Sequence, residues 1–429
     1  MVRRWLPNVY EGWIVVGSSA FIVTMIGASF FYGFGTIFNP LRDEFGWSSA
    51  ATSLAFSLRQ ETSGIAAPFI GMTIDRVGPR RVLLFGLAMV SIGVIGMSFM
   101  QNLFQFYVAM FVIAIGTSSA GGQVGLVAIA TWFEARRARA MSFMTIGGGV
   151  AGIFVVFVAL LVEALGWRGA LRTMAGVIIV VGTLAALNVR ARPARHHQPM
   201  DGIRRADYRE DDEELPDWGV PIRRAVTSRA FLLVALALVA NGFATTAIIV
   251  HQIPFLESIG VSSGLAGASV AVFTTTSIVG RLGAGFLADK YDKRIVLAGS
   301  IGLAGLGLPL LAIAGNFWTA VLALLIIAPG FGGAIPVRPA LLADYFGTKY
   351  FGTLNGILML LATFGSFGGP LLVGWLFDRT GDYTASWLVC GAVGLLAVPV
   401  ALAATAPRAL TEEYRTIPGP PTAGTSAAG

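Results

Sequence analysis

Long apolar stretches recur along this 429-residue chain and constrain its fold more than any other feature. A helix that crosses the hydrocarbon core of a bilayer needs about 20 predominantly apolar residues. Twelve stretches of that length are separated by short charged loops, and they lie near 12–38, 48–73, 81–101, 103–131, 138–162, 167–189, 229–256, 263–288, 294–315, 317–343, 353–377 and 385–407. The pattern predicts an all-α membrane protein with twelve transmembrane helices.

The composition excludes several other classes of protein. Charged residues make up 12% of the chain, whereas soluble domains carry about 25%. The single cysteine, Cys390, excludes a disulfide framework and a cysteine-based metal site. His196 and His197 have no third ligand at a suitable spacing, so we expect no metal and no cofactor. The spans hold no cluster of acidic and histidine residues and no serine with a neighbouring base, which argues against an enzyme.

The basic residues predict the orientation of the spans, because cytoplasmic loops are enriched in Lys and Arg. One side of the predicted bundle carries the loops with Arg76, Arg80, Arg81, Arg136, Arg137, Arg139, Lys290, Lys293 and Arg294. The other side carries little beyond Arg42, Arg168 and Arg379. We therefore expect both termini in the cytoplasm, in the inner membrane of a bacterium. Attraction to anionic lipid then accounts for the net charge of +7, and no nucleic-acid partner is expected.

One long non-apolar interval, residues 190–228, divides the spans into six and six. It is rich in arginine at both ends and acidic in the middle, which is typical of a solvated linker. The expected organisation is an N-terminal six-helix bundle (1–189), a cytoplasmic linker (190–228), a C-terminal six-helix bundle (229–407) and a disordered cytoplasmic tail (408–429).

A loop motif recurs in the two halves at a constant offset. The loop after the second span begins GMTIDRVGPRR, and the loop after the eighth begins GFLADKYDKR. Four of its residues return 214 positions later: Gly71, Asp75, Arg76 and Arg80 correspond to Gly285, Asp289, Lys290 and Arg294. Glycine permits close helix approach, and aspartate at a helix end can pair with arginine or cap backbone amides. We interpret these eight residues as a conformational latch between two halves that rock around a midplane site.

This motif, its copy and the six-plus-six layout resemble the major facilitator superfamily. The segments 32–35, 45–48, 280–285 and 343–347 are similar to its monocarboxylate-transporter and oxalate/formate-antiporter branches. The resemblance implies two pseudo-symmetric six-helix bundles. It also implies a secondary active transporter that moves a small organic anion, a monocarboxylate, by alternating access. Transport would be proton-coupled symport or anion exchange (antiport), by a monomer.

Arg281 is the leading substrate-binding candidate, because a charged side chain at the bilayer centre costs at least about 2.5–3.5 kcal/mol. Thr274, Ser277 and Arg281 share one helix face. A guanidinium can hold a carboxylate through two parallel hydrogen bonds. In the resembling branches an arginine of this helix binds the substrate carboxylate. The alternative is an arginine that reaches to lipid phosphate, although Asp289 at the helix end lies about 12 Å further along.

The sequence departs from the branch pattern. Ser277 stands where animal monocarboxylate carriers have an aspartate, the first span has no lysine, and 353–377 holds no lysine or arginine. One cation rather than two favours a monoanion over a dicarboxylate. Glu61 is the candidate proton-coupling group, because a carboxyl group buried in a membrane readily holds a proton. Arg59 would be a second anion contact; a structural polar pair is the competing interpretation.

Further candidates for the cavity wall lie near span midpoints, with helix packing as the competing interpretation: Tyr32, Ser119, Gln123, Asn241 and Phe331. The sequence G-G-G-V-A-G at 147–152 matches a dinucleotide-binding pattern but lies inside an apolar helix, so it indicates packing. The alternative function is proton-coupled efflux of lipophilic drug-like compounds. Drug antiporters of this fold carry a Pro-containing motif in the fifth span, and 138–162 contains no proline.

Overall fold

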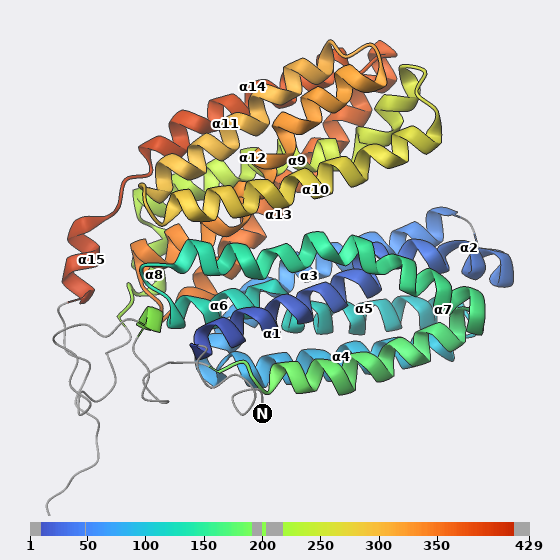
Figure 1. Ribbon diagram of the computed structural model, residues 1–429, viewed down its shortest axis with the longest axis horizontal. Helices are drawn as coiled ribbons and strands as arrows, with labels where there is room; N and C mark the ends of the chain where they lie inside the picture. The colour runs from blue at the N-terminus through green and yellow to red at the C-terminus, as the bar shows by residue number, and fades with distance from the viewer. Residues whose placement is uncertain (1–9, 48, 191–199, 203–217, 416–429) are drawn as a thin grey trace, which may run out of the picture.

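The computed structural model describes the backbone of residues 10–47, 49–190, 200–202 and 218–415. Side chains are described for the same residues except 30–32, 39, 42, 49–53 and 55–61. Almost all of this chain is helical (Figure 1). The N-terminal half contains α1 (Glu11–Ile26), a π-helical turn (Gly27–Tyr32), α2 (Phe34–Phe45), α3 (Ser49–Val77), α4 (Pro79–Ser98), α5 (Leu103–Ala120), α6 (Gly122–Trp132) and α7 (Arg137–Ala186).

The C-terminal half begins after the central segment. It contains α9 (Arg229–Ser258), α10 (Ser263–Ala288), α11 (Lys293–Ala312), α12 (Phe317–Phe346), α13 (Phe351–Thr380) and α14 (Thr384–Ala403). Shorter elements are a 3-10 turn (Met200–Gly202), α8 (Ile222–Val226) and α15 (Arg408–Arg415).

The helices account for the twelve predicted spans. Ten helical segments are long and apolar enough to cross a membrane, counted over the described residues. One of them, the 50-residue α7, breaks at Gly166, whose φ of 67° is a backbone conformation that glycine adopts without steric cost. The two parts of α7 therefore supply two crossings. The remaining crossing is α3, which is less apolar but, with 29 residues, about 44 Å long. The predicted all-α membrane architecture is confirmed, and its helices are consistent with twelve crossings in two bundles.

Local sequence sets the helix boundaries. Gly78 (φ 85°) ends α3 and is followed by Pro79 at the first position of α4, where a missing N–H does no harm. Asn102 caps α5 by accepting a hydrogen bond from the backbone N–H of Gln105. Asn316 and Thr319 form a reciprocal capping box at the start of α12.

The two halves lie one above the other in Figure 1, the first in blue and green and the second in yellow to red. They approach each other at the end near α8 and diverge toward the end near α2. We call the first of these the motif end, because it carries both repeated loops, 71–80 and 285–294. The long helices α3 and α13 pack together across the halves, as do α7 and α10.

The segments outside the bundles differ in part from expectation. Residues 408–415, predicted to lack order, form the amphipathic helix α15. Its contacts to the rest of the protein include a hydrogen bond from Thr411 to the backbone carbonyl of Tyr345 (3.1 Å) and ion pairs of Glu413 with Arg224 (2.8 Å) and of Arg415 with Glu134 (3.3 Å). Much of the linker lies outside the described residues, His196 and His197 included.

Candidate functional site

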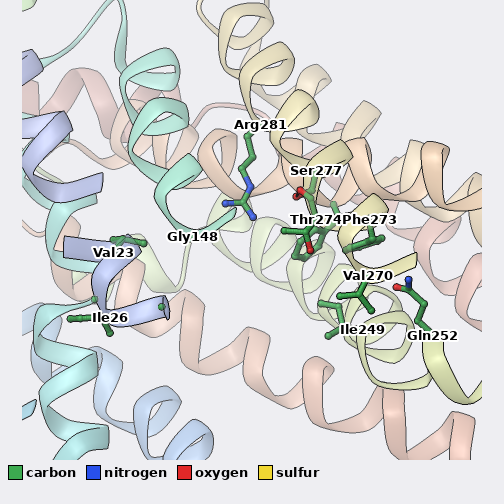
Figure 2. Close-up of a pocket in the computed structure, with 14 residues that line it drawn as sticks. Val23, Ile26, Gly148, Ile249, Gln252, Val270, Phe273, Thr274, Ser277 and Arg281 are labelled. Atoms are coloured by element: carbon green, nitrogen blue, oxygen red, sulfur yellow. Dashed lines mark hydrogen bonds between the residues drawn. The ribbon is translucent and has the colours of Figure 1, made fainter. Parts of the chain in front are cut away.

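A cavity of about 380 Å³ lies between the two halves (Figure 2). Most of its wall is apolar or glycine. The N-terminal half contributes Val23, Ile26, Gly27, Gly121, Gly122 and Gly148. The C-terminal half contributes Ile249, Gln252, Val270, Phe273, Thr274, Ser277, Arg281 and Phe331. The polar groups that a ligand can meet therefore belong to the C-terminal half.

Arg281 is the one charged side chain among the described residues that line this cavity. It is buried, with 8% of its surface exposed, and its guanidinium points across to the N-terminal half near Gly148 (Figure 2). There its Nη1 donates a hydrogen bond to the backbone carbonyl of Thr145 in α7. Arg281 thus lies in the cavity and joins the two halves.

The three residues predicted to share one face of α10 all face the cavity. Thr274 lines the cavity, and so do Ser277, about one helical turn after it, and Arg281, about two turns after it. The Ser277 hydroxyl donates to the carbonyl of Thr274 (2.7 Å), which leaves its oxygen as an acceptor. Phe331 of α12 completes the predicted set, and its ring lies 5.4 Å from that of Phe273 between centroids.

The other predicted cavity residues whose side chains the structure describes do not line it. Ser119 is fully buried and donates to the carbonyl of Ile115 (2.9 Å). Gln123 instead joins the halves: its Nε2 donates to the carbonyls of Ala67 (3.2 Å) in α3 and Gly352 (3.1 Å) in α13. The Asn241 carbonyl accepts from Thr245 within α9. The side chains of Tyr32, Arg59 and Glu61 lie outside those that the structure describes.

Sequence reasoning missed several cavity residues. Gln252 lies well beyond the midpoint of α9, toward its C-terminal end, whereas Phe273 lies next to the predicted Thr274 near the middle of α10. A buried glutamine in an apolar helix was the available signal for the first. The glycines of the wall carry no side-chain chemistry that a sequence pattern could reveal.

At the motif end, the repeated aspartates cap helices of the opposite half. The carboxylate of Asp75 accepts hydrogen bonds from the backbone N–H groups of Gly352 and Thr353 (both 2.8 Å) and from the Thr353 hydroxyl (2.7 Å). These residues start α13, whose first-turn amides have no partner within the helix. A negative charge is favourable at that position.

Asp289 makes the matching contact in the other direction. Its carboxylate accepts from the backbone N–H groups of Ala138 (3.1 Å) and Arg139 (3.4 Å), at the start of α7, and it pairs with the Arg139 side chain (3.3 Å). The capped residues, like the aspartates, are related by 214 positions. Burial raises the pKa of the Asp289 carboxyl group, although the N–H and charge of Arg139 act in the opposite direction.

The two motif glycines allow this approach. A Cβ atom on Gly71 would lie 2.1 Å from the backbone oxygen of Gly352, and one on Gly285 would lie 1.8 Å from Ser142 Oγ. The basic motif residues do not join the halves in this way. Arg76, Arg80 and Lys290 are exposed, and Arg294 donates to the carbonyl of Leu402 within its own half (2.9 Å).

A partly buried ion-pair network adds to the closure of the motif end. Arg137 of α7 pairs with Asp344 of α12, which also pairs with Lys293 of α11 (2.6 Å). From the sequence alone, Arg137 and Lys293 are expected only to orient the spans. Among the described residues, hydrogen bonds between the halves run from Arg281 to the motif end. The two halves are therefore in contact between the cavity and the motif end, and the cavity is closed on that side.

Comparison with known proteins places these features in a family. The sequence profile of the Major Facilitator Superfamily matches residues 20–258 and 232–423. The chain is 27% identical over 407 residues to mouse (Mus musculus) monocarboxylate transporter 11, covering 90% of this chain and 85% of that protein. It is 24% identical over 422 residues to mouse monocarboxylate transporter 12, covering 90% and 83%.

Two solved structures share the fold. The Escherichia coli fucose:proton symporter superposes with a TM-score of 0.68 at 14% identity, covering 92% of this chain and 98% of that one. The human organic anion transporter MFSD10 gives the same TM-score and identity, covering 92% and 100%. At this identity the likeness concerns the fold alone.

Proposed function

Because the chain belongs to the Major Facilitator Superfamily, a family of multi-pass membrane transporters, we propose that it moves a small monocarboxylate by alternating access. The observation that carries the proposal is Arg281, a buried cation in an otherwise uncharged and largely apolar cavity between two halves. The names of its monocarboxylate-transporter relatives support the same substrate class.

The cavity wall suggests how such a substrate is held. The guanidinium of Arg281 would bind the carboxylate through two parallel hydrogen bonds. The apolar body of the substrate would pack against Phe273 and Phe331. A second carboxylate would find no second cation on the described wall, so a monoanion is favoured over a dicarboxylate. A lipophilic cation would be repelled by the positive charge of Arg281, which makes drug efflux the weaker candidate.

Alternation would use the contacts at the motif end. We propose that this end faces the cytoplasm of a bacterial cell and that the bundles 1–189 and 229–407 rock about the cavity, joined by the linker 190–228. Opening would break both aspartate caps and the pair between Arg137 and Asp344. Glu61 remains our candidate for proton coupling, with Arg59 as a second anion contact.

Uptake into proteoliposomes tests the proposal, with labelled formate, lactate, oxalate and arylalkanoates, and with and without a pH gradient. We expect monocarboxylate uptake that Arg281→Gln abolishes. Arg281→Lys should bind the substrate about 10- to 100-fold more weakly, because an ammonium lacks the planar fork and a charged hydrogen bond contributes about 1.5–3 kcal/mol. Arg379→Gln, an exposed arginine at the end of α13, is the matched control. Failure of the folded protein to carry any monocarboxylate, or full activity of Arg281→Gln, would reject the proposal.

The coupling role is tested separately. In Glu61→Gln, uptake should lose its dependence on the pH gradient while exchange of substrate across the membrane continues. If the pH dependence of uptake is unchanged in this variant, another group carries the proton or the protein is an exchanger.

A further inference from the structure

A second polar group, Gln252 of α9, lies at the opposite end of the cavity from Arg281 (Figure 2). Its side chain is buried, with 3% exposed. The Nε2 atom donates to Ser269 Oγ at 2.6 Å, and Ser269 Oγ in turn donates to the carbonyl of Ala266 at 2.6 Å.

This chain of hydrogen bonds determines which way the amide of Gln252 faces. A serine hydroxyl has one hydrogen, and the hydrogen of Ser269 is used on Ala266. Its oxygen can therefore only accept, so the amide nitrogen of Gln252 must face it. Ser269 is fully buried and does not line the cavity, whereas Gln252 does. The carbonyl oxygen of Gln252 is left as an acceptor on the cavity side, and the described residues supply no donor to it.

The two polar ends are far apart. Twelve residues of α10 separate Ser269 from Arg281, which corresponds to about 18 Å along the helix axis. A helical side chain leans toward the start of its helix, so the guanidinium shortens this span. Between the ends the wall is largely apolar and partly aromatic, formed by Phe273, Phe331 and Val270, with the hydroxyl groups of Thr274 and Ser277 on the Arg281 side. Formate or lactate bound at Arg281 would leave most of this wall uncovered.

Resting on the carboxylate site proposed above, we propose that the cavity selects monocarboxylates with an extended apolar body and a hydrogen-bond donor at the distal end. Arg281 binds the carboxylate, and the carbonyl oxygen of Gln252 accepts a hydrogen bond from a distal hydroxyl or N–H group. The aromatic pair of Phe273 and Phe331 favours an aryl body over a flexible chain, because rings stack with a small loss of conformational freedom. Gln252 is thus a specificity-determining residue.

Matched ligands test this assignment. Proteoliposome uptake would be compared for phenyl and 4-hydroxyphenyl carboxylates whose linkers to the carboxylate contain one to four carbons. We expect the hydroxylated ligand to be preferred at one linker length by about 5- to 100-fold, since a buried acceptor left unpaired costs about 1–3 kcal/mol. Gln252→Met keeps the side-chain size but removes the acceptor. It should remove the preference and still carry the phenyl ligand.

A second variant tests the same preference in case Gln252→Met does not fold. Ser269→Ala removes the anchor of the amide and should reduce the same preference while leaving phenyl-ligand uptake intact. Equal uptake of phenyl and hydroxyphenyl ligands by the wild type at every length, or an unchanged preference in both variants, would overturn the inference. Arg281-dependent uptake of formate or lactate without any arylalkanoate uptake would overturn it and leave the proposed function standing. No uptake of any monocarboxylate would reject both.

Discussion

At Gly285 the two halves are as close as their atoms allow. A Cβ atom there would lie 1.8 Å from Ser142 Oγ and 2.7 Å from Ser142 Cβ, so the contact tolerates no side chain without movement. Two turns before Gly285 in the sequence, Ser277 is packed as closely, against Gly332 of α12, but within one half. If the halves move apart, the contact between Gly285 and Ser142 must separate, whereas the contact between Ser277 and Gly332 can stay intact. The glycine at 285 therefore bears on the balance between conformations as well as on packing.

Gly285→Ala should shift the protein toward a conformation open at the motif end. Overpacking a close contact costs about 1–3 kcal/mol, and separation of the halves relieves it. The measurement is the labelling rate of a cysteine introduced at Ala138, using a membrane-impermeant thiol reagent, with the single native Cys390 buried. We expect about a 5- to 100-fold increase in rate. Gly283→Ala is the control, because a Cβ atom at that position would have no neighbour within 4 Å beyond the adjoining turns of its own helix. Equal rates in the two variants would contradict the prediction.

Single residues also show what could be predicted from the sequence. The motif repeat identified Asp75 and Asp289, because the same chemistry recurs at equivalent places. Helical spacing put Thr274, Ser277 and Arg281 on one face, and the cavity wall agrees. Depth along a helix suggested Gln123 for the cavity wall, but its side chain joins α3 and α13 instead. The direction of a side chain depends on the rotation of its helix in the bundle, and periodicity within one helix does not determine that rotation.

At the level of elements, the starts of α7 and α13 depend on the opposite half for their caps. Neither helix has a capping side chain at its own N-cap residue, Arg136 or Tyr350. Their first amides are instead satisfied by Asp289 and Asp75 when the halves meet. The proposed opening of the motif end would therefore expose both helix starts to water, which can replace the lost hydrogen bonds.

Closure of the motif end should depend on pH through Asp289. Burial raises the pKa of this carboxyl group in the closed arrangement, whereas water restores it toward its ordinary value when the halves separate. The closed state then binds the proton more tightly. By linkage, closure is favoured as the pH falls through the raised pKa and disfavoured as the pH rises above it.

The predicted pH dependence can be measured by energy transfer between dyes attached at the motif end of the two halves. Transfer should increase as the medium is acidified from neutral pH. Asp289→Asn mimics the neutral carboxyl group, so it should stay closed and lose this part of the response. Asp292→Asn is the control, because Asp292 is exposed and contacts residues of its own half. A variant Asp289→Asn with the full wild-type pH response would contradict this assignment.

Across the whole molecule, the two halves are symmetric at the motif end and asymmetric in the cavity. The motif glycines, the aspartates and the helix starts they cap repeat at 214 positions. The residue that corresponds to Arg281 at this offset is Ala67, which contributes only its backbone carbonyl to Gln123. In the proposed mechanism, opening and closing are thus shared by both halves, while ligand binding depends on the side chains of one. Hydropathy predicted the six-plus-six layout, but which faces of the two halves meet is a property of their docking, which hydropathy does not encode.

Locking the halves together should stop transport if they must separate. At Gly64 of α3, a Cβ atom would lie 3.4 Å from the Cβ of Thr363 in α13, close to the spacing of about 3.5–4.5 Å in disulfides. The double variant Gly64→Cys/Thr363→Cys should therefore form a disulfide across the halves. Oxidation should abolish uptake nearly completely, and a reducing agent should restore it.

The control for this crosslink lies within one half. Gly242 of α9 adjoins Ser366 of α13, with Ser366 Oγ 3.0 Å from a Cβ atom on Gly242. A disulfide between cysteines at these positions ties together helices that move as one body in the rocking mechanism. Uptake should survive its oxidation. If the crosslink between Gly64 and Thr363 forms and transport continues, the halves do not separate along α3 and α13, and rocking about the cavity is wrong for this protein.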